Sequence, residues 1–229
     1  MRVVQRGGGK GSLKWIQRLV NARPDLAASE LRSLVGGEGP VEWLSPLTSD
    51  GFAEYRDGSA LKLLGVSTHE RALSDFWPVR GPQWDALARV GDAPVLVEAK
   101  AHVAELFSGE CRAKGEKSRL QIERALKETK NWLEAQPGLD WMRRFYQYTN
   151  RLAHLYFLRE ANGIDAHLVF LYFLGDGQMG GPRSRKEWEV ATEVLHEALG
   201  IRGRRIPGLH HLYVEVGELE SATGRVEDR

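Results

Sequence analysis

Two acidic residues and a lysine lie where a β-hairpin would bring them together. The dipeptide Gly91-Asp92 separates two apolar-rich runs and is a turn signal typical of a hairpin. With the turn centred there, Asp85 faces Glu98, and strand alternation puts Lys100 on the same face. Carboxylates opposite each other repel, which gives no gain in stability. The spacing therefore favours a divalent cation between Asp85 and Glu98, with the Lys100 ammonium beside it.

A cation held by two acids, with a lysine beside it, can activate water for hydrolysis, and the family resemblance described next implies that the bond cleaved is a phosphodiester. The reaction needs an activated water and neutralised phosphate charge, and Mg²⁺ supplies both while binding carboxylates and retained waters. We predict that Asp85 and Glu98 bind Mg²⁺, with Mn²⁺ as a substitute. Lys100 would orient or deprotonate the attacking water or neutralise the transition state, and we favour the electrostatic role. The alternative is a surface salt-bridge cluster in which Lys100 neutralises one carboxylate.

The same residues carry a resemblance to a known family. An acid at the end of one strand and Glu-x-Lys on the next resemble the PD-(D/E)XK nucleases, which have the restriction-endonuclease-like fold. The matching residues are Asp85, Glu98 and Lys100, and Trp84 stands where the family usually has proline. The whole chain also resembles a family of uncharacterised bacterial proteins with this core. The resemblance implies a Mg²⁺-dependent deoxyribonuclease.

The resemblance also implies metal ligands besides the two facing acids. By analogy with the family, the carbonyl of Ala99 is one such ligand. The family also has an acid on a preceding helix, and we predict Glu54, because it falls on the same side of the expected helix as Leu61. Glu70 is the alternative if a later short helix is the correct one. The ordinary interpretation of Glu54 is a solvated glutamate near a helix start, where acids are favoured.

Polar and basic groups elsewhere are candidates for contact with nucleic acid. One group recurs at helical spacing on an otherwise apolar segment and comprises Gln147, Asn150, Arg151 and His154. A second group places three cations at a helix start, an unusual position for them, and comprises Arg183, Arg185 and Lys186. Further candidates for phosphate contact are Lys114, Lys117, Arg119, Arg143 and Arg144. The alternatives are a solvated helix face, buried hydrogen bonds to loops, and ordinary solvated charges.

Composition narrows the classes of protein. The chain has 229 residues, 42% hydrophobic and 28% charged, with a net charge of +1, so a strongly basic nucleic-acid binder is not indicated. Local basic clusters can still bind phosphate. The single Cys111 excludes an internal disulfide, and the seven histidines show no metal-ligand spacing. The first residues lack an apolar signal-peptide core, and no apolar run is long enough to span a membrane. We therefore expect a cytoplasmic protein.

Periodicity and capping signals predict a chain of alternating helices and strands. The expected helices cover residues 12–22, 24–35, 52–64, 116–135, 140–162 and 184–199. Besides the hairpin, the expected strands cover residues 75–79, 168–174 and 211–216. This order predicts a three-layer α/β/α sandwich with a mixed central sheet, the restriction-endonuclease-like core, plus N-terminal helices.

The expected domain organisation has four parts: a mobile tail at 1–11, a helical cap at 12–48, a nuclease core at 49–219 and a second tail at 220–229. We predict a metal-dependent nuclease that hydrolyses phosphodiester bonds in DNA; RNA as the substrate and a homodimer stay open. The alternative is a non-catalytic nucleic-acid or protein binding module that retains the nuclease fold. A different metal-dependent hydrolase or a purely structural protein is a further rival.

Overall fold

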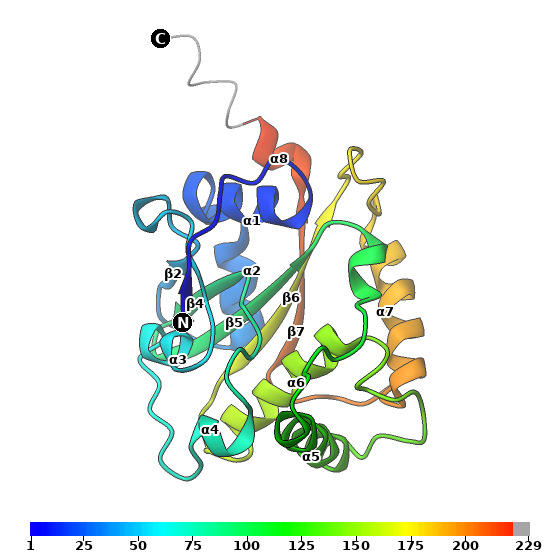
Figure 1. Cartoon of the computed structure of the whole chain (residues 1–229). Helices are drawn as coiled ribbons and strands as arrows, with labels where there is room; N and C mark the ends of the chain where they lie inside the picture. The colour runs from blue at the N-terminus through cyan, green and yellow to red at the C-terminus, as the bar shows by residue number, and fades with distance from the viewer. Residues whose placement is uncertain (222–229) are drawn as a thin grey trace.

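The computed structural model describes residues 1–221 and shows a mixed α/β fold (Figure 1). The strands are β1 (Arg2–Val3), β2 (Val41–Ser45), β3 (Glu54–Tyr55), β4 (Ala86–Val90), β5 (Ala93–Lys100), β6 (His167–Leu174) and β7 (Leu209–Glu215). The helices are α1 (Gly11–Ala22), α2 (Asp25–Val35), α3 (Gly58–Leu63), α4 (Leu73–Phe76), α5 (Glu116–Trp132), α6 (Tyr146–Arg159), α7 (Arg185–Leu199) and α8 (Val216–Glu220). Within the described range, no helix is long and apolar enough to cross a membrane.

Five strands form a mixed sheet in the order β2-β4-β5-β6-β7. The first two pairings are antiparallel and the last two are parallel. The predicted hairpin is confirmed: β4 and β5 pair with Val90 opposite Ala93 and Leu87 opposite Leu96. The turn places Gly91 at φ +57°, a conformation that glycine adopts without strain. The two-residue turn and the apolar residues of the two flanking strands together fix this register.

Helices cover both faces of the sheet. Figure 1 shows α1 and α2 on one face and α5, α6 and α7 on the other. Alternate strand residues divide between the two cores, so Leu96 packs toward α5–α7 while Val97 packs toward α1 and α2. Strand β6 is buried along its whole length, which confirms the prediction from its unbroken apolar sequence.

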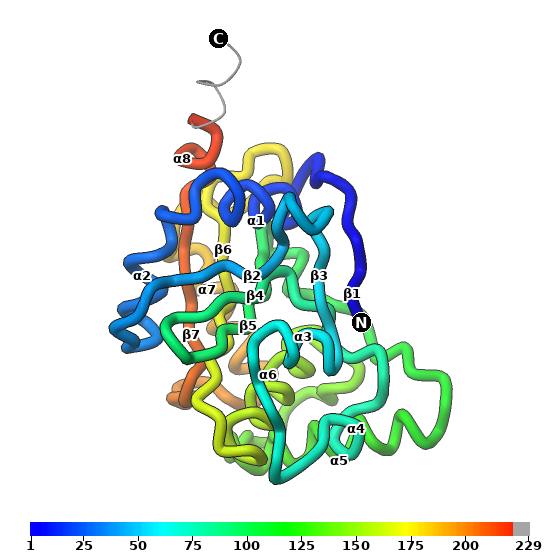
Figure 2. Tube along the Cα trace, turned by 90° about the vertical axis from the view of Figure 1, so that its left-hand side faces the viewer, coloured from blue at the N-terminus to red at the C-terminus, as the bar shows by residue number. Residues whose placement is uncertain are grey.

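The N-terminal segment differs from the expected mobile tail. Strand β1 pairs antiparallel with β3, and the side-chain amide of Gln5 donates to Glu54 over 3.0 Å. Figure 2 shows this segment lying beside β3. Strand β2 joins the edge of the main sheet, although it lies inside the segment 12–48 that we expected to be a helical cap. Most of the predicted tail at 220–229 lies outside the described residues.

Three predicted elements are wrong in type or length. The segment 75–79 is not a strand, since residues up to Phe76 form α4 and the Phe76 and Trp77 rings are buried against α6. The helix expected at 52–64 is reduced to α3, because Phe52 and Asp57 adopt positive φ angles that interrupt it. The helix expected from residue 140 begins only at Tyr146, after Phe145 at φ +55°.

Candidate active site

Asp85 lies just before the first residue of β4, at the open end of the hairpin. Its Oδ2 atom accepts a hydrogen bond of 2.8 Å from the backbone amide of Ala99 on β5. The Asp85 carboxylate is therefore tied to the strand that carries Glu98 and Lys100. This contact agrees with the prediction that the hairpin brings Asp85, Glu98 and Lys100 to one place.

Glu98 is fully buried and its charge is compensated on both sides. The Lys100 ammonium binds Oε1, and the Arg151 guanidinium donates from Nε to Oε2 over 2.6 Å. Burial opposes ionisation of Glu98, yet the two cations hold its pKa below the usual value. Because a carboxylate offers about four lone-pair sites, Glu98 keeps acceptor capacity beyond these two bonds.

Arg151 is the residue whose role the sequence did not indicate. It is 3% exposed on α6, and its other two nitrogens donate to the carbonyl of Gln83 and the side chain of Asn150, each over 2.8 Å. The guanidinium also lies 4.8 Å from the centre of the Trp84 ring. Helical spacing placed Arg151 among polar residues on one side of its helix. Its partner Glu98 is 53 residues away in the sequence, and no local sequence pattern indicates a contact between such distant residues.

Glu54 lies near the hairpin, on β3 rather than on the helix that we predicted. Its Oε2 atom accepts hydrogen bonds from the side-chain amides of Gln83 (2.5 Å) and Gln5 (3.0 Å). Burial, and to a smaller extent the charge of Glu98, raise the pKa of Glu54. The alternative acid, Glu70, is exposed and does not line the cavity described next.

A cavity of about 480 Å³ opens beside these groups, and we call it the Asp85 cavity. Its lining includes Glu54, Asp85, Gln147, Asn150 and Arg151, so part of the predicted nucleic-acid group gathers here. Glu98 and Lys100 lie behind this lining, at 0% and 6% exposure.

The remaining predicted contacts lie elsewhere. His154 is buried and packs its ring against Trp77 and Trp84, which makes it part of the core. Arg183, Arg185 and Lys186 sit at the start of α7 and do not line the Asp85 cavity. The helix start is held instead by a capping box between Ser184 and Glu187.

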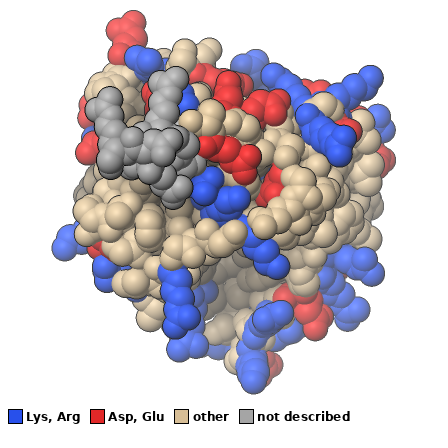
Figure 3. Space-filling view, turned by 90° about the horizontal axis from the view of Figure 1, so that it is seen from above, with Lys and Arg blue, Asp and Glu red and all other residues tan. Residues whose placement is uncertain are grey.

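The cavity lining mixes three acids, Glu54, Asp85 and Glu110, with three arginines, Arg80, Arg112 and Arg151. Burial first, and then the charge of Glu98, raise the pKa of Asp85 to about 8, while Lys100 lowers it. Asp85 is only partly buried, so water at the cavity moderates this repulsion. Lys and Arg side chains are interspersed with Asp and Glu on the face shown in Figure 3, and no extended area there carries a single sign. An anionic substrate would meet its cations in the cavity itself, at Arg80, Arg112 and Arg151.

The donor set is suited to a hard divalent cation, with one restriction. Among residues 1–221, no three His, Cys, Asp or Glu side chains converge closely enough to form a ready three-ligand site. Mg²⁺ does not require one, since it commonly binds through one or two carboxylates plus waters and substrate phosphates. Asp85 and Glu98 meet that requirement, and the like-charge repulsion at Asp85 is the kind that a bound cation relieves.

The chain was also compared with known proteins. No protein-family model matches it, and neither a curated protein nor a solved structure does. The assignment of a function therefore depends on the geometry and chemistry of the Asp85 cavity.

Proposed function

We propose that this protein is a metal-dependent nuclease that hydrolyses phosphodiester bonds in DNA. The observation that carries the proposal is the hydrogen bond from the Ala99 amide to Asp85, which fixes an acid against the strand bearing Glu98 and Lys100. Acids and a lysine at the mouth of a hairpin, beside a cavity, form a set that suits phosphodiester hydrolysis and that stability alone does not explain.

Asp85 and Glu98 would hold the metal ion, with Mg²⁺ as the expected ion and Mn²⁺ as a substitute. The carbonyl of Ala99 is a further candidate ligand, and Glu54 is a candidate on the far side of Asp85. When bound, the ion would activate water and neutralise phosphate charge. In this proposal Lys100 keeps Glu98 ionised and presents a positive charge to the reacting phosphate.

The order of elements supports a restriction-endonuclease-like core. The hairpin β4–β5 is followed by α5 and α6, then by β6 parallel to β5, and then by α7 and the parallel strand β7. The first strand of such a core would be β2, which pairs antiparallel with β4. With helices on both faces, this is the sandwich that the resemblance to PD-(D/E)XK nucleases implies.

The direct test is DNA cleavage by the purified protein. In Mg²⁺ or Mn²⁺, supercoiled and linear DNA should be nicked or degraded, and EDTA should stop the reaction. Asp85→Asn keeps an oxygen acceptor for the Ala99 amide, and Lys100→Ala removes the ammonium. Each should lower the cleavage rate by about 100-fold or more. Asp85→Asn should leave the fold intact by circular dichroism. Lys100→Ala also removes a cation from buried Glu98, so its cleavage is measured at a temperature where circular dichroism shows it folded.

Lys62→Ala provides a matched control, because Lys62 is exposed on α3, away from the Asp85 cavity. It should cleave at the rate of the unaltered protein. Metal-dependent cleavage that survives both Asp85→Asn and Lys100→Ala would contradict the proposal, since a contaminating nuclease or another site would then be responsible.

One observation favours the second candidate, a non-catalytic binding module that retains the fold. Both oxygens of Glu98 are already engaged by Lys100 and Arg151, and the pair lies behind the cavity lining. Calorimetric titration with Mn²⁺ separates the two candidates. A nuclease should bind Mn²⁺ through Asp85, and a binding module of this kind should bind DNA with no metal at all.

A further inference from the structure

Two further cavities continue from the Asp85 cavity along the surface. The middle cavity, of about 220 Å³, shares Ser108 and Gly109 with the Asp85 cavity. The far cavity, of about 390 Å³, shares Arg143 with the middle one and Glu110 with the Asp85 cavity. The shared lining residues place the three cavities next to one another, and we call the three together the groove.

The middle cavity contains an exposed aromatic ring. Phe107 is 58% exposed, and its ring centre lies 5.3 Å from that of Phe145, which is buried. The buried ring supports the exposed one from below. Phe145 itself is held at φ +55°, an uncommon conformation for a residue with a side chain. An exposed aromatic ring on a rigid base is a surface on which a flat, unpaired base can stack.

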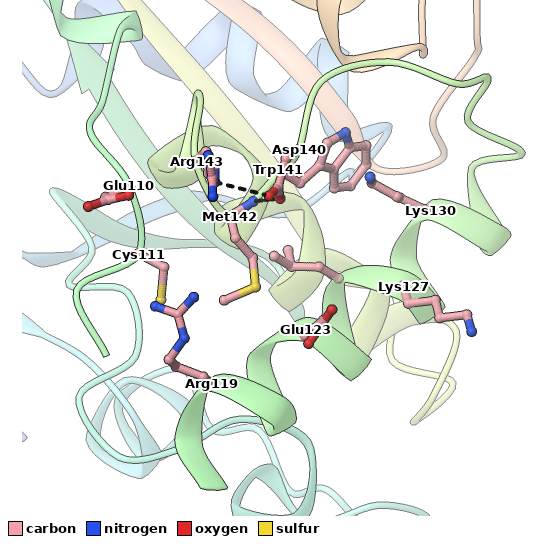
Figure 4. A pocket seen from close by; sticks show the side chains of 11 residues that line it. Glu110, Cys111, Arg119, Glu123, Lys127, Lys130, Asp140, Trp141, Met142 and Arg143 are labelled. Atoms are coloured by element: carbon pink, nitrogen blue, oxygen red, sulfur yellow. Dashed lines mark hydrogen bonds and ion pairs between the residues drawn. The ribbon is translucent and has the colours of Figure 1, made fainter. Parts of the chain in front are cut away.

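Cations surround the same ring. The remaining side chains of the middle cavity include Arg143 and Arg144, and no acid lines it. Arg144 forms no ion pair with any described residue, and Arg143 contacts only the exposed Asp140, over 3.7 Å. The far cavity is different, since Glu110, Glu123 and Asp140 line it together with its cations. Figure 4 shows Arg143 next to Asp140 on one side of it and Glu123 of α5 opposite.

We propose that the groove binds a single-stranded nucleic-acid segment, with a base stacked on Phe107 and phosphates on Arg143 and Arg144, leading into the Asp85 cavity. The proposal rests on the proposed nuclease function and names the form of its substrate. A duplex fits this chemistry poorly, because its bases are paired and stacked already and do not expose a face to Phe107.

The test measures binding without catalysis. Fluorescently labelled oligonucleotides of equal length, as single-stranded DNA, duplex DNA and single-stranded RNA, are titrated with the full chain in EDTA, and Kd is read from anisotropy. Phe107→Ala should weaken single-strand binding by about 5- to 100-fold and change duplex binding by less than about twofold. Phe107→Trp should restore single-strand binding, whereas Phe107→Leu, which is apolar but lacks a π face, should not.

Arg144 is tested through salt dependence. Arg144→Gln should lower the slope of log Kobs against log salt by about 0.7 for the single strand, as expected for one lost phosphate contact. Arg32→Gln is the matched control, because Arg32 is exposed on α2, on the other face of the sheet, and the net charge changes equally. Val194→Ala, at 59% exposure on α7, is the control for loss of an exposed apolar group.

The outcomes separate this inference from the nuclease proposal. Equal effects of Phe107→Ala on single strands and duplex, or no effect on either, would overturn the groove while leaving metal-dependent cleavage intact. Single-strand binding that depends on Phe107, without cleavage in Mg²⁺ or Mn²⁺, would instead support the groove proposal and contradict the nuclease proposal. Comparison of DNA and RNA strands shows which sugar the groove accepts.

Discussion

Two regions of this molecule bury titratable side chains and manage their charge in opposite ways. The Asp85 cavity holds acids and keeps Glu98 ionised by bringing Lys100 and Arg151 against it. A second cavity, of about 470 Å³, lies at the outer edge of β7 and is lined by His196, His210 and His211. We call it the histidine cavity.

The three histidines of this cavity avoid charge rather than compensating it. Burial lowers the pKa of His211 to about 3 and those of His196 and His210 to about 4, so all three are neutral at physiological pH. Their rings stack or form neutral hydrogen bonds: His211 stacks on Tyr172, and His196 contacts the Tyr148 hydroxyl over 2.6 Å. A buried carboxylate between two cations is costly to assemble, and a neutral imidazole is not.

The difference indicates which region is built for function. A fold that needs only stability can use neutral groups, as at β7. The Asp85 cavity keeps a fully buried glutamate ionised and places a second acid against it, an arrangement that reduces stability unless a ligand uses it. We therefore expect the two regions to respond to different agents: loss of a buried cation and addition of a metal ion should affect the Asp85 cavity, and acid should affect the histidine cavity.

The largest effect should follow removal of Arg151. Arg151→Met leaves the buried Glu98 with Lys100 alone and the Gln83 carbonyl without its donor, so it should lower the free energy of unfolding by about 3–5 kcal/mol in urea titrations. Arg185→Met is the control, since the Arg185–Glu189 pair is exposed and should contribute less than about 1 kcal/mol. If both variants lost the same free energy of unfolding, the buried ion pairs of Glu98 would contribute no more to stability than an exposed pair, which would contradict the comparison.

Metal binding should give the next largest effect. If the two acids bind Mg²⁺, the ion at 100 times its Kd should raise the free energy of unfolding by about 2.7 kcal/mol. Asp85→Asn should abolish this gain. Without metal and above about pH 8, where Asp85 is ionised, it should make the protein about 1 kcal/mol more stable, because it removes one of two neighbouring anions. Thermal melts with and without EDTA measure both quantities. A gain from Mg²⁺ that Asp85→Asn retains would place the ion elsewhere.

Acid should weaken the histidine cavity. Because folding lowers these histidine pKa values, the unfolded state binds more protons below pH 6.5, and stability should be full above that pH and fall toward pH 4. Each histidine contributes up to about 1.4 kcal/mol per pH unit in that window. His211→Phe keeps the stacked ring and should flatten the slope. His69→Phe, at an exposed position, should leave it unchanged.

The smallest effect should come from the cations at the start of α7. The triple variant Arg183→Gln, Arg185→Gln, Lys186→Gln should change DNA binding by less than about twofold, because these side chains do not line the Asp85 cavity. Electrophoretic mobility shifts measure this. A large loss of binding would show that these cations contact phosphate, as the sequence indicated. It would also mean that the bound DNA does not follow the groove at Phe107.

The hairpin was predictable because its signals are local. A turn dipeptide and alternating apolar residues set the register, and the register brought Asp85 to the strand of Glu98. Strand β6 was equally predictable, because its sequence is an unbroken apolar run. Each depends on residues that are close in sequence, so propensity and periodicity were sufficient.

The errors have tertiary causes. Residues 75–79 look like a strand, but Phe76 and Trp77 are instead packed onto α6 as part of the helical layer. Glu54 could not be placed on its strand because Asp57, at φ +54°, turns the chain to accept the amides of Arg80 and Gly81. The ion pair of Arg151 with Glu98 likewise depends on how α6 docks, which helical spacing alone does not specify.

The contact between the Ala99 amide and the Asp85 carboxylate gives the site a built-in spectroscopic reporter. The resonance of an amide proton that donates to a carboxylate shifts when that carboxylate changes charge or acquires a new partner. In a ¹⁵N-labelled sample, the Ala99 cross-peak would thus register an ion or a phosphate arriving at Asp85 without any chemical label. The Ala99 cross-peak can therefore follow binding at the cavity while cross-peaks from the rest of the sheet stay at their positions.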